Sequence, residues 1–347
     1  MHQTVEDSVD YRQLRPRDPL ELWLVQRWRQ VLGFAVGIRD NFFGMGGNSL
    51  DAARVVNAVW EEFGIQLPLN VMTTSPEIEK LAAELRDRHV RLAGPAVEIQ
   101  YGEGAHPPLF LVHPVSGQVD AYWGLSQALG DEFAVFGLQA VGLYSDEAPL
   151  ETVPAMAGRY VEALRSVQPA GPYCLGGCST GSVIAFEMAR QLVDSGAQVR
   201  LLAVIDPALV PGASNGRTRQ DAPDAAGVLF DMLVGAAGPE SAFRRLPATR
   251  QAGRVLDDWK AHDAVAENET TDFVWRAQRV RSANYTAARG YSPDRYPGTV
   301  DVFRMPGSRR PDLDWCAVAS DRIHLEATDD ESLARQLRSR ITAEVHP

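Results

Sequence analysis

The chain has 347 residues, 45% of them hydrophobic, and a formal net charge of -11. This length and apolar content are sufficient for two hydrophobic cores, one small and one large. The acidic charge without a basic cluster excludes a nucleic-acid surface and disfavours anionic membranes, since both need basic patches. No apolar run approaches the roughly 20 residues of a membrane span, and the first residues lack the features of a secretory signal. We therefore expect a cytoplasmic protein with neither nucleic acid nor a membrane as a partner.

Three cysteines, Cys174, Cys178 and Cys316, form an odd set. No second Cys or His cluster accompanies Cys174 and Cys178, so their spacing predicts no metal site. Cysteines of this kind are typical of small buried side chains in a reducing compartment.

The N-terminal part of the chain predicts a small helical domain. Apolar residues recur at helical spacing in 18–33, 49–64 and 75–85. Asp18 before Pro19 starts the first helix, and glycines end the first two helices. Ser75 is expected to cap the third helix.

Ser49 follows a glycine-rich turn and opens the second predicted helix. A phosphodiester on Ser49 would lie at the positive end of the helix macrodipole, near unpaired backbone N–H groups. The alternative interpretation is that Ser49 only caps the helix. The surrounding pattern, Asp-x-Phe-Phe and then Gly-Gly-x-Ser-Leu, favours an attachment site, with Phe42 and Phe43 as core residues that hold the loop.

From Leu109 onward, apolar runs alternate with helical or loop segments. This alternation predicts a mostly parallel sheet covered on both faces, with chemistry at the carboxyl ends of its strands. The expected strands are 109–112, 133–138, 173–175, 201–205 and 300–303, and the preceding linker is expected to supply one edge strand at 97–101.

Ser179 lies in Gly-Cys-Ser-Thr-Gly, after one of these strands and before a predicted helix. Gly-x-Ser-x-Gly in this context predicts a nucleophile elbow, in which a sharp turn presents the serine at a helix N-terminus. In such sites the amide after the nucleophile, here Thr180, donates to the oxyanion. The competing interpretation is a glycine-rich turn with an incidental serine.

Both serine motifs resemble parts of one protein family. The first is similar to the phosphopantetheine attachment site of peptidyl carrier domains. The second resembles the nucleophile elbow of the thioesterases that end nonribosomal peptide assembly lines. This resemblance implies a small all-α four-helix carrier bundle followed by an α/β-hydrolase domain with a helical lid. It also implies a serine thioesterase that works through an acyl-enzyme, with 4'-phosphopantetheine bound covalently to Ser49.

A serine nucleophile needs a base and an acid, which follow it in the order Ser, Asp, His in this fold. We expect His324 to be the base, since His262 lies in the variable region and His346 in the tail. His324 is expected after the last strand and before the C-terminal helix. Asp206 directly follows a strand, as in the resembled thioesterases, and is preferred as the acid. Asp312 and Asp314 are the later alternatives.

The segment His-Pro-Val-Ser-Gly at 113–117 resembles the His-Pro-x-x-Gly segment of these thioesterases. The resemblance implies that the Val115 N–H is the second oxyanion donor. His113 precedes Ser179, and we expect it to be structural. Ser116 and Cys178 depart from the residues that family members commonly carry.

These patterns divide the chain into parts that correspond to the resembled didomain. Residues 211–272 lose the strand and helix alternation, and this insertion resembles a lid. The expected parts are an N-terminal linker, 1–15; a carrier, 16–88; a second linker, 89–108; and a thioesterase domain, 109–347, with its lid at about 211–272.

The predicted function is the terminal unit of a nonribosomal peptide synthetase in natural product biosynthesis. An acyl or peptidyl group would pass from the arm on Ser49 to Ser179 and be released by hydrolysis or macrocyclisation. The partners implied are a phosphopantetheinyl transferase, the upstream condensation and adenylation domains, and the acyl or peptidyl substrate. The chain is expected to be cut from a larger synthetase. The alternatives are an editing thioesterase, or a carrier and docking module with a noncatalytic acyl-binding domain.

Overall fold

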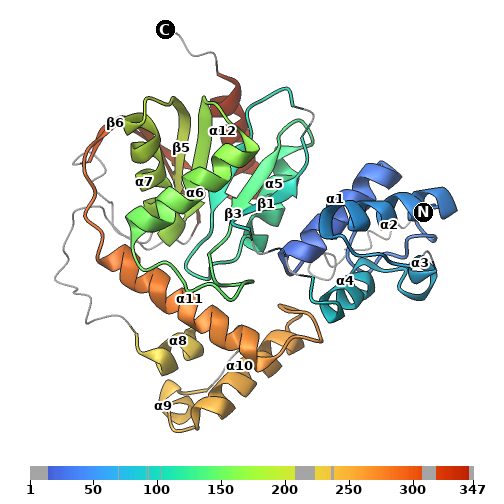
Figure 1. The fold of residues 1–347 in the computed structure, drawn as a ribbon. Helices are drawn as coiled ribbons and strands as arrows, with labels where there is room; N and C mark the ends of the chain where they lie inside the picture. The colour runs from blue at the N-terminus through green and yellow to red at the C-terminus, as the bar shows by residue number, and fades with distance from the viewer. Residues whose placement is uncertain are drawn as a thin grey trace, which may run out of the picture. The chain divides into compact units, whose positions relative to one another are not determined.

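The structure is a computed structural model that divides into two compact units (Figure 1). Unit 1 comprises Met1–Arg91 with Lys260–Asn268, and unit 2 comprises Leu92–Trp259 with Glu269–Pro347. For Arg322 and His324 only the backbone is described. The described residues are 15–68, 70–90, 92, 94–102, 104–207, 223–235, 238–306 and 318–343.

The described residues of unit 1 form four helices. The Asp18 side chain caps the first helix by accepting from Glu21 N, and Gly33 ends it in the left-handed conformation, as predicted. Inside the unit, the buried rings of Trp28 and Phe42 pack edge to face at 4.8 Å. The helices are α1 (Pro19–Leu32), α2 (Ser49–Phe63), α3 (Val71–Thr74) and α4 (Ile78–Asp87).

Two details of unit 1 differ from the sequence prediction. Ser75 does not cap the third long helix: it ends α3, and α4 begins at Ile78 after Glu77. Phe43 is 38% exposed, so only Phe42 of the aromatic pair belongs to the core. The four-residue helix α3 is too short to show a helical apolar pattern, which explains why the sequence did not reveal it.

Unit 2 contains a seven-stranded sheet in the order β1-β3-β2-β4-β5-β6-β7. Strand β1 pairs with β3 in the antiparallel sense, and every other pairing is parallel. The predicted mostly parallel sheet is thus confirmed. The strands are β1 (Ala96–Gln100), β2 (Leu109–Val112), β3 (Val135–Leu138), β4 (Tyr173–Cys178), β5 (Val199–Ile205), β6 (Tyr296–Arg304) and β7 (Ala319–Glu326).

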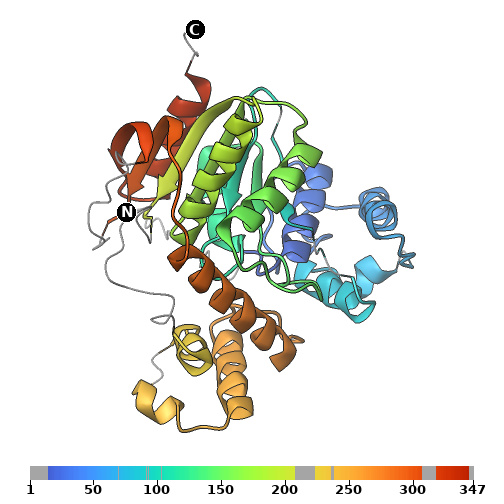
Figure 2. The same ribbon diagram turned by 60° about the vertical axis from the view of Figure 1, so that its left-hand side comes forward.

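Helices cover both faces of this sheet (Figures 1 and 2). One face carries α6 (Val153–Val167) and α7 (Thr180–Asp194), whose buried side chains pack against β2, β4, β5 and β6. The other face carries α5 (Trp123–Leu129), after the short 3-10 helix η2 (Asp120–Tyr122), and α12 (Asp330–Thr342). Among the described helices, none is long and apolar enough to cross a membrane.

The described residues between β5 and β6 form four helices. The expected lid region contains α8 (Ala225–Asp231), α9 (Glu240–Phe243) and α10 (Ala248–Ala261). The long α11 (Thr271–Arg289) follows and leads back to the sheet (Figure 2). We expected all of 211–272 to belong to the second domain, but residues 260–268 group with unit 1.

Candidate active site

Ser49 is the first residue of α2 and is exposed. Asn48, not Ser49, is the N-cap: its side chain accepts from Leu50 N and Asp51 N. The capping role is therefore filled by the neighbouring residue, and the Ser49 hydroxyl is available for modification. A phosphate on this hydroxyl would lie at the helix N-terminus, where the macrodipole favours negative charge.

Gly47 shapes the turn that leads to Ser49. A Cβ atom at Gly47 would lie 2.5 Å from the Phe42 ring and 2.8 Å from the Phe42 carbonyl oxygen. Only glycine fits this contact without displacing the core ring. The packing of Phe42 thus fixes the path of the chain just before the serine.

Ser179 occupies a sharp turn between β4 and α7. Its backbone has φ 58° and ψ -120°, a conformation that is strained for a residue with a Cβ. A Cβ at Gly177 would lie 2.4 Å from Gly181, which shows how tightly the turn is folded. This is the geometry of a nucleophile elbow, in which the serine is raised above the sheet edge.

The start of α7 also lies against the end of β2. A Cβ at Gly181 would lie 2.4 Å from the Val112 carbonyl oxygen and 2.5 Å from the His113 carbonyl oxygen. The glycines of the motif therefore bring the segment 113–117 next to the turn that holds Ser179. The sequence prediction of a shared site for these two segments agrees with this placement.

Asp206 follows β5, the strand next to β4. Its backbone N–H donates to Phe303 O at 2.9 Å, and its Oδ1 accepts from Met305 N at 3.1 Å. With φ 39°, Asp206 has a backbone conformation that residues with a Cβ rarely adopt. Ser179 and Asp206 thus both lie just beyond the carboxyl ends of adjacent strands. Asp312 and Asp314 lie outside the described residues.

The two expected oxyanion donors lie on these same segments. Thr180 begins α7, where the first amides of a helix have no intrahelical acceptor. Val115 lies in the segment that contacts Gly181, and its carbonyl oxygen accepts from Asn284 Nδ2 at 3.1 Å. Asn284 is a buried residue of α11, so α11 holds the backbone of the second donor in place. Their role as donors stays a prediction.

Two polar residues that the sequence does not single out hold this part of the structure together. Asn284 binds Val115, in the segment after β2. The Tyr122 hydroxyl joins the ends of β2 and β4: it donates to Val112 O at 2.6 Å and accepts from Cys178 N at 2.9 Å. Burial raises the pKa of Tyr122, which keeps this hydroxyl protonated. Neither residue belongs to a motif, so only their polarity on otherwise buried helix faces could have indicated a role.

His113 is held by its neighbours, as expected of a structural residue. Its Nδ1 lies 2.7 Å from Pro114 O, and its Nε2 lies 2.7 Å from the Tyr160 hydroxyl. Complete burial lowers its pKa to about 4, so the ring is neutral at pH 7. Because a carbonyl oxygen can only accept, Nδ1 carries the proton and Nε2 accepts from Tyr160.

The position of His324 differs from the prediction. His324 does not follow the last strand but lies within β7, two residues before its end, paired with Val302 of β6. In the same row, Val302 pairs with Val204 and Val204 pairs with Gly177. Three strand spacings therefore separate His324 from the Ser179 strand, which is about 14 Å. The role of His324 as the base stays a prediction.

The described residues contain no cluster of His, Cys, Asp and Glu that could hold a metal. Cys174 and Cys178 are free thiols. A serine in a sharp strand-to-helix turn at the carboxyl edge of a mostly parallel sheet, with an aspartate after the next strand, is the arrangement typical of serine hydrolases of the α/β class.

Comparison with known proteins assigns both units. Residues 22–85 match the family model for a phosphopantetheine attachment site, and residues 107–336 match the model for a thioesterase domain. The second match covers more than half of the chain, so the chain belongs to the thioesterase family. With the attachment domain in front, it is a carrier and thioesterase didomain of the nonribosomal peptide synthetase type.

Relatives among synthetases support this assignment. The chain is 36% identical over 192 residues to a dimodular nonribosomal peptide synthase of Bacillus subtilis, covering 55% of this chain and 8% of that protein. It is 34% identical over 227 residues to indigoidine synthase of Dickeya dadantii, covering 63% of this chain and 15% of that protein. The chain thus spans a small part of these relatives.

Solved structures show the same fold. A holo four-domain nonribosomal peptide synthetase, AB3403, bound to AMP and glycine, matches 98% of this chain and 26% of its own, with TM-score 0.81 and 25% identity. The NocB thioesterase domain in covalent complex with a fluorophosphonate nocardicin G analogue matches 70% of this chain and 97% of its own. Its TM-score is 0.50 at 24% identity, a likeness of fold.

Proposed function

We propose that this chain takes an acyl or peptidyl thioester from phosphopantetheine on Ser49, transfers the acyl group to Ser179 and releases it. Release by water is hydrolysis, and release by an amine or hydroxyl of the same acyl chain is macrocyclisation. The observation that carries this proposal is the strained Ser179 backbone at the turn between β4 and α7. Strain of this kind is kept where function requires it.

The attachment domain fits the arm that the proposal requires. Ser49 is exposed at the start of a 15-residue helix, and the neighbouring Asn48 supplies the cap. When bound, the phosphopantetheine group supplies a flexible thiol that carries the acyl group as a thioester. The partners that follow are a phosphopantetheinyl transferase and the upstream condensation and adenylation domains.

The acyl transfer is balanced by simple bond changes. The Ser179 hydroxyl gives up its proton to the base as its oxygen forms an ester bond with the acyl carbon; the thioester C–S bond breaks, and the same proton passes to the sulfur of the arm, which leaves as a thiol. Amide donors at Thr180 and Val115 would stabilise the oxyanion formed between these steps. Asp206 is the proposed acid of the site. His324 is the proposed base, which takes the proton from the Ser179 hydroxyl.

The test uses the full chain, loaded by a phosphopantetheinyl transferase that transfers the acyl-phosphopantetheine group from an acyl-coenzyme A to Ser49 and releases 3',5'-ADP. Intact mass should show that Ser179→Ala keeps the acyl group on the arm while product formation stops. Cys178→Ala is the matched control, because it removes the neighbouring thiol and should leave release unchanged. Product release at the parent rate from Ser179→Ala would refute covalent catalysis at Ser179.

A further inference from the structure

Asp263 lies in the turn between α10 and α11, within the segment Lys260–Asn268 that groups with unit 1. Its backbone has φ 54°, a left-handed conformation that aspartate and asparagine tolerate better than most residues. Val265 and Ala266 of the same segment are buried. The turn is therefore packed in unit 1, although both flanking helices belong largely to unit 2.

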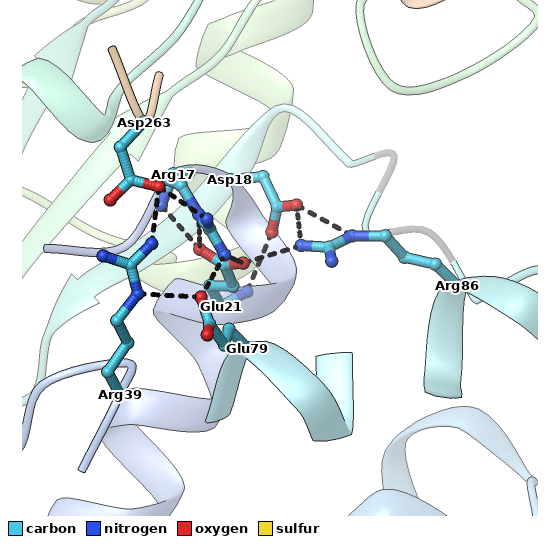
Figure 3. Close-up of polar contacts among 7 residues, drawn as sticks. All are labelled: Arg17, Asp18, Glu21, Arg39, Glu79, Arg86 and Asp263. Carbon is cyan, nitrogen blue, oxygen red and sulfur yellow. Dashed lines mark hydrogen bonds and ion pairs between the residues drawn. The ribbon is translucent and has the colours of Figure 1, made fainter. Parts of the chain in front are cut away.

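Unit 1 contains a cluster of charged residues around the start of α1 (Figure 3). At its centre is Glu21, which is completely buried. Arg17 binds the Glu21 carboxylate through Nε at 3.1 Å and Nη2 at 2.7 Å, and Arg86 Nη2 lies 3.0 Å from the same group. Arg86 also bonds Asp18, the cap of α1. These contacts fasten α1 to α4.

The Asp263 carboxylate binds at the edge of this cluster. Its Oδ1 accepts from Arg17 Nη1 at 2.9 Å and from Arg39 Nη2 at 2.8 Å (Figure 3). Glu79 of α4 bonds the same two arginines, at 3.3 Å to Arg17 and 3.1 Å to Arg39. Two guanidinium groups from unit 1 thus receive one carboxylate from a segment 246 positions away from Arg17.

The contact between Arg17 and Asp263 contributes to stability mainly because Arg17 is buried. Arg17 is 6% exposed, while its neighbouring carboxylates keep its pKa raised despite that burial, so the group stays charged. Its Nε and Nη2 bond Glu21, and Nη1 bonds Asp263. Hydrogen bonds to charged groups contribute more than neutral ones, and a buried charge that loses a partner is destabilised. Exposed ion pairs contribute much less.

We propose that Asp263 is the docking residue by which the turn 260–268 binds the helical unit of its own chain. Arg17 and Arg39 form the receiving surface, and the occupant is this segment of the same chain. The proposal does not depend on the chemistry at Ser179.

Hydrogen exchange of the full chain, followed by mass spectrometry, tests this docking. Asp263→Asn keeps the left-handed turn but removes the charge. We expect amides of 260–268 to exchange about 5- to 30-fold faster, the factor that corresponds to a loss of one or two kcal/mol. Glu267→Gln is the matched control: it makes the same charge change at an exposed position of the same segment and should have no effect.

A second variant tests the receiving surface. Arg39 is 37% exposed, so Arg39→Gln should fold, and it should also speed exchange in 260–268. Because both changes break the same ion pair, the double variant should be less affected than the product of the two single effects. Unchanged exchange in both Asp263→Asn and Arg39→Gln would overturn the proposal, as would an equal effect of Glu267→Gln.

Discussion

The Ser179 backbone N–H donates a hydrogen bond of 3.0 Å to Ile205 O, the carbonyl oxygen directly before Asp206. On the β4 side, the hydrogen bonding to β5 therefore continues one residue beyond Cys178, up to the serine itself. The nucleophile and the acid of the proposed site are held in register by this bond. Neither depends on a long loop for its position.

This register makes Asp206→Asn an informative variant. The amide can still accept from Met305 N, so the fold should remain intact, with an unchanged melting temperature. The neutral amide no longer supplies the negative charge that stabilises the protonated base after it takes the Ser179 proton. Turnover should therefore fall by about 10²–10⁴-fold. Near-normal turnover of Asp206→Asn, with a collapse in a variant of Asp312 or Asp314, would move the acid to the later segment.

His324→Gln tests the position of the expected base. His324 is the base proposed for this site, so the rate of Ser179 acylation, measured in a single turnover by intact mass, should fall by about 10²-fold or more. A change of less than about threefold would remove His324 from the role of base.

The sequence predicted the strands that carry the site because these strands are continuous apolar runs. Strand β2 matched at both ends, and β5 ended at Ile205 as expected, which placed Asp206 at the sheet edge. The sequence does not predict strand β7, because Ala319–Glu326 mixes Asp321, Arg322 and His324 with few apolar residues. Hydrophobic periodicity cannot identify such a strand, so the sequence places His324 after the last strand.

Contacts between distant segments were the other part that the sequence could not show. Asp263 carries no local pattern that points to Arg17, because the two residues are 246 positions apart. Asn284 is likewise an ordinary polar residue in a helix until the fold brings it to Val115. Motifs identify the reacting groups in such a chain, whereas packing decides which residues hold them.

Asn284→Leu should separate positioning from binding. The change keeps the side-chain size but removes the donor to Val115 O, so the segment 113–117 loses an anchor. We expect kcat to fall about tenfold or more with KM within about twofold, since small misplacements of catalytic groups lower rates strongly. Gln278→Leu is the control, because this buried amide of α11 bonds Ser282 on its own helix. An equal loss of kcat in both variants would assign the effect to general damage of α11.

Ser49→Ala should abolish loading by a phosphopantetheinyl transferase. The hydroxyl is exposed, and the capping of α2 belongs to Asn48, so the variant should fold as the parent does. Intact mass after incubation should show one added arm on the parent and none on the variant. Addition of an arm to Ser49→Ala would place the attachment site elsewhere in the chain.

The pH dependence of stability should carry a contribution from His113. Its pKa is lowered to about 4 by burial, whereas an unfolded histidine titrates near 6.5. The unfolded chain therefore takes up a proton first as the pH falls, and the folded state loses stability between about pH 6.5 and 4. The full contribution is about 3 kcal/mol, present above pH 6.5. His113→Gln should lower the melting temperature at pH 7.5, because Tyr160 loses its acceptor, yet give a shallower decline toward pH 4.5. A decline as steep as that of the parent would show that His113 is not the group that is kept neutral by burial.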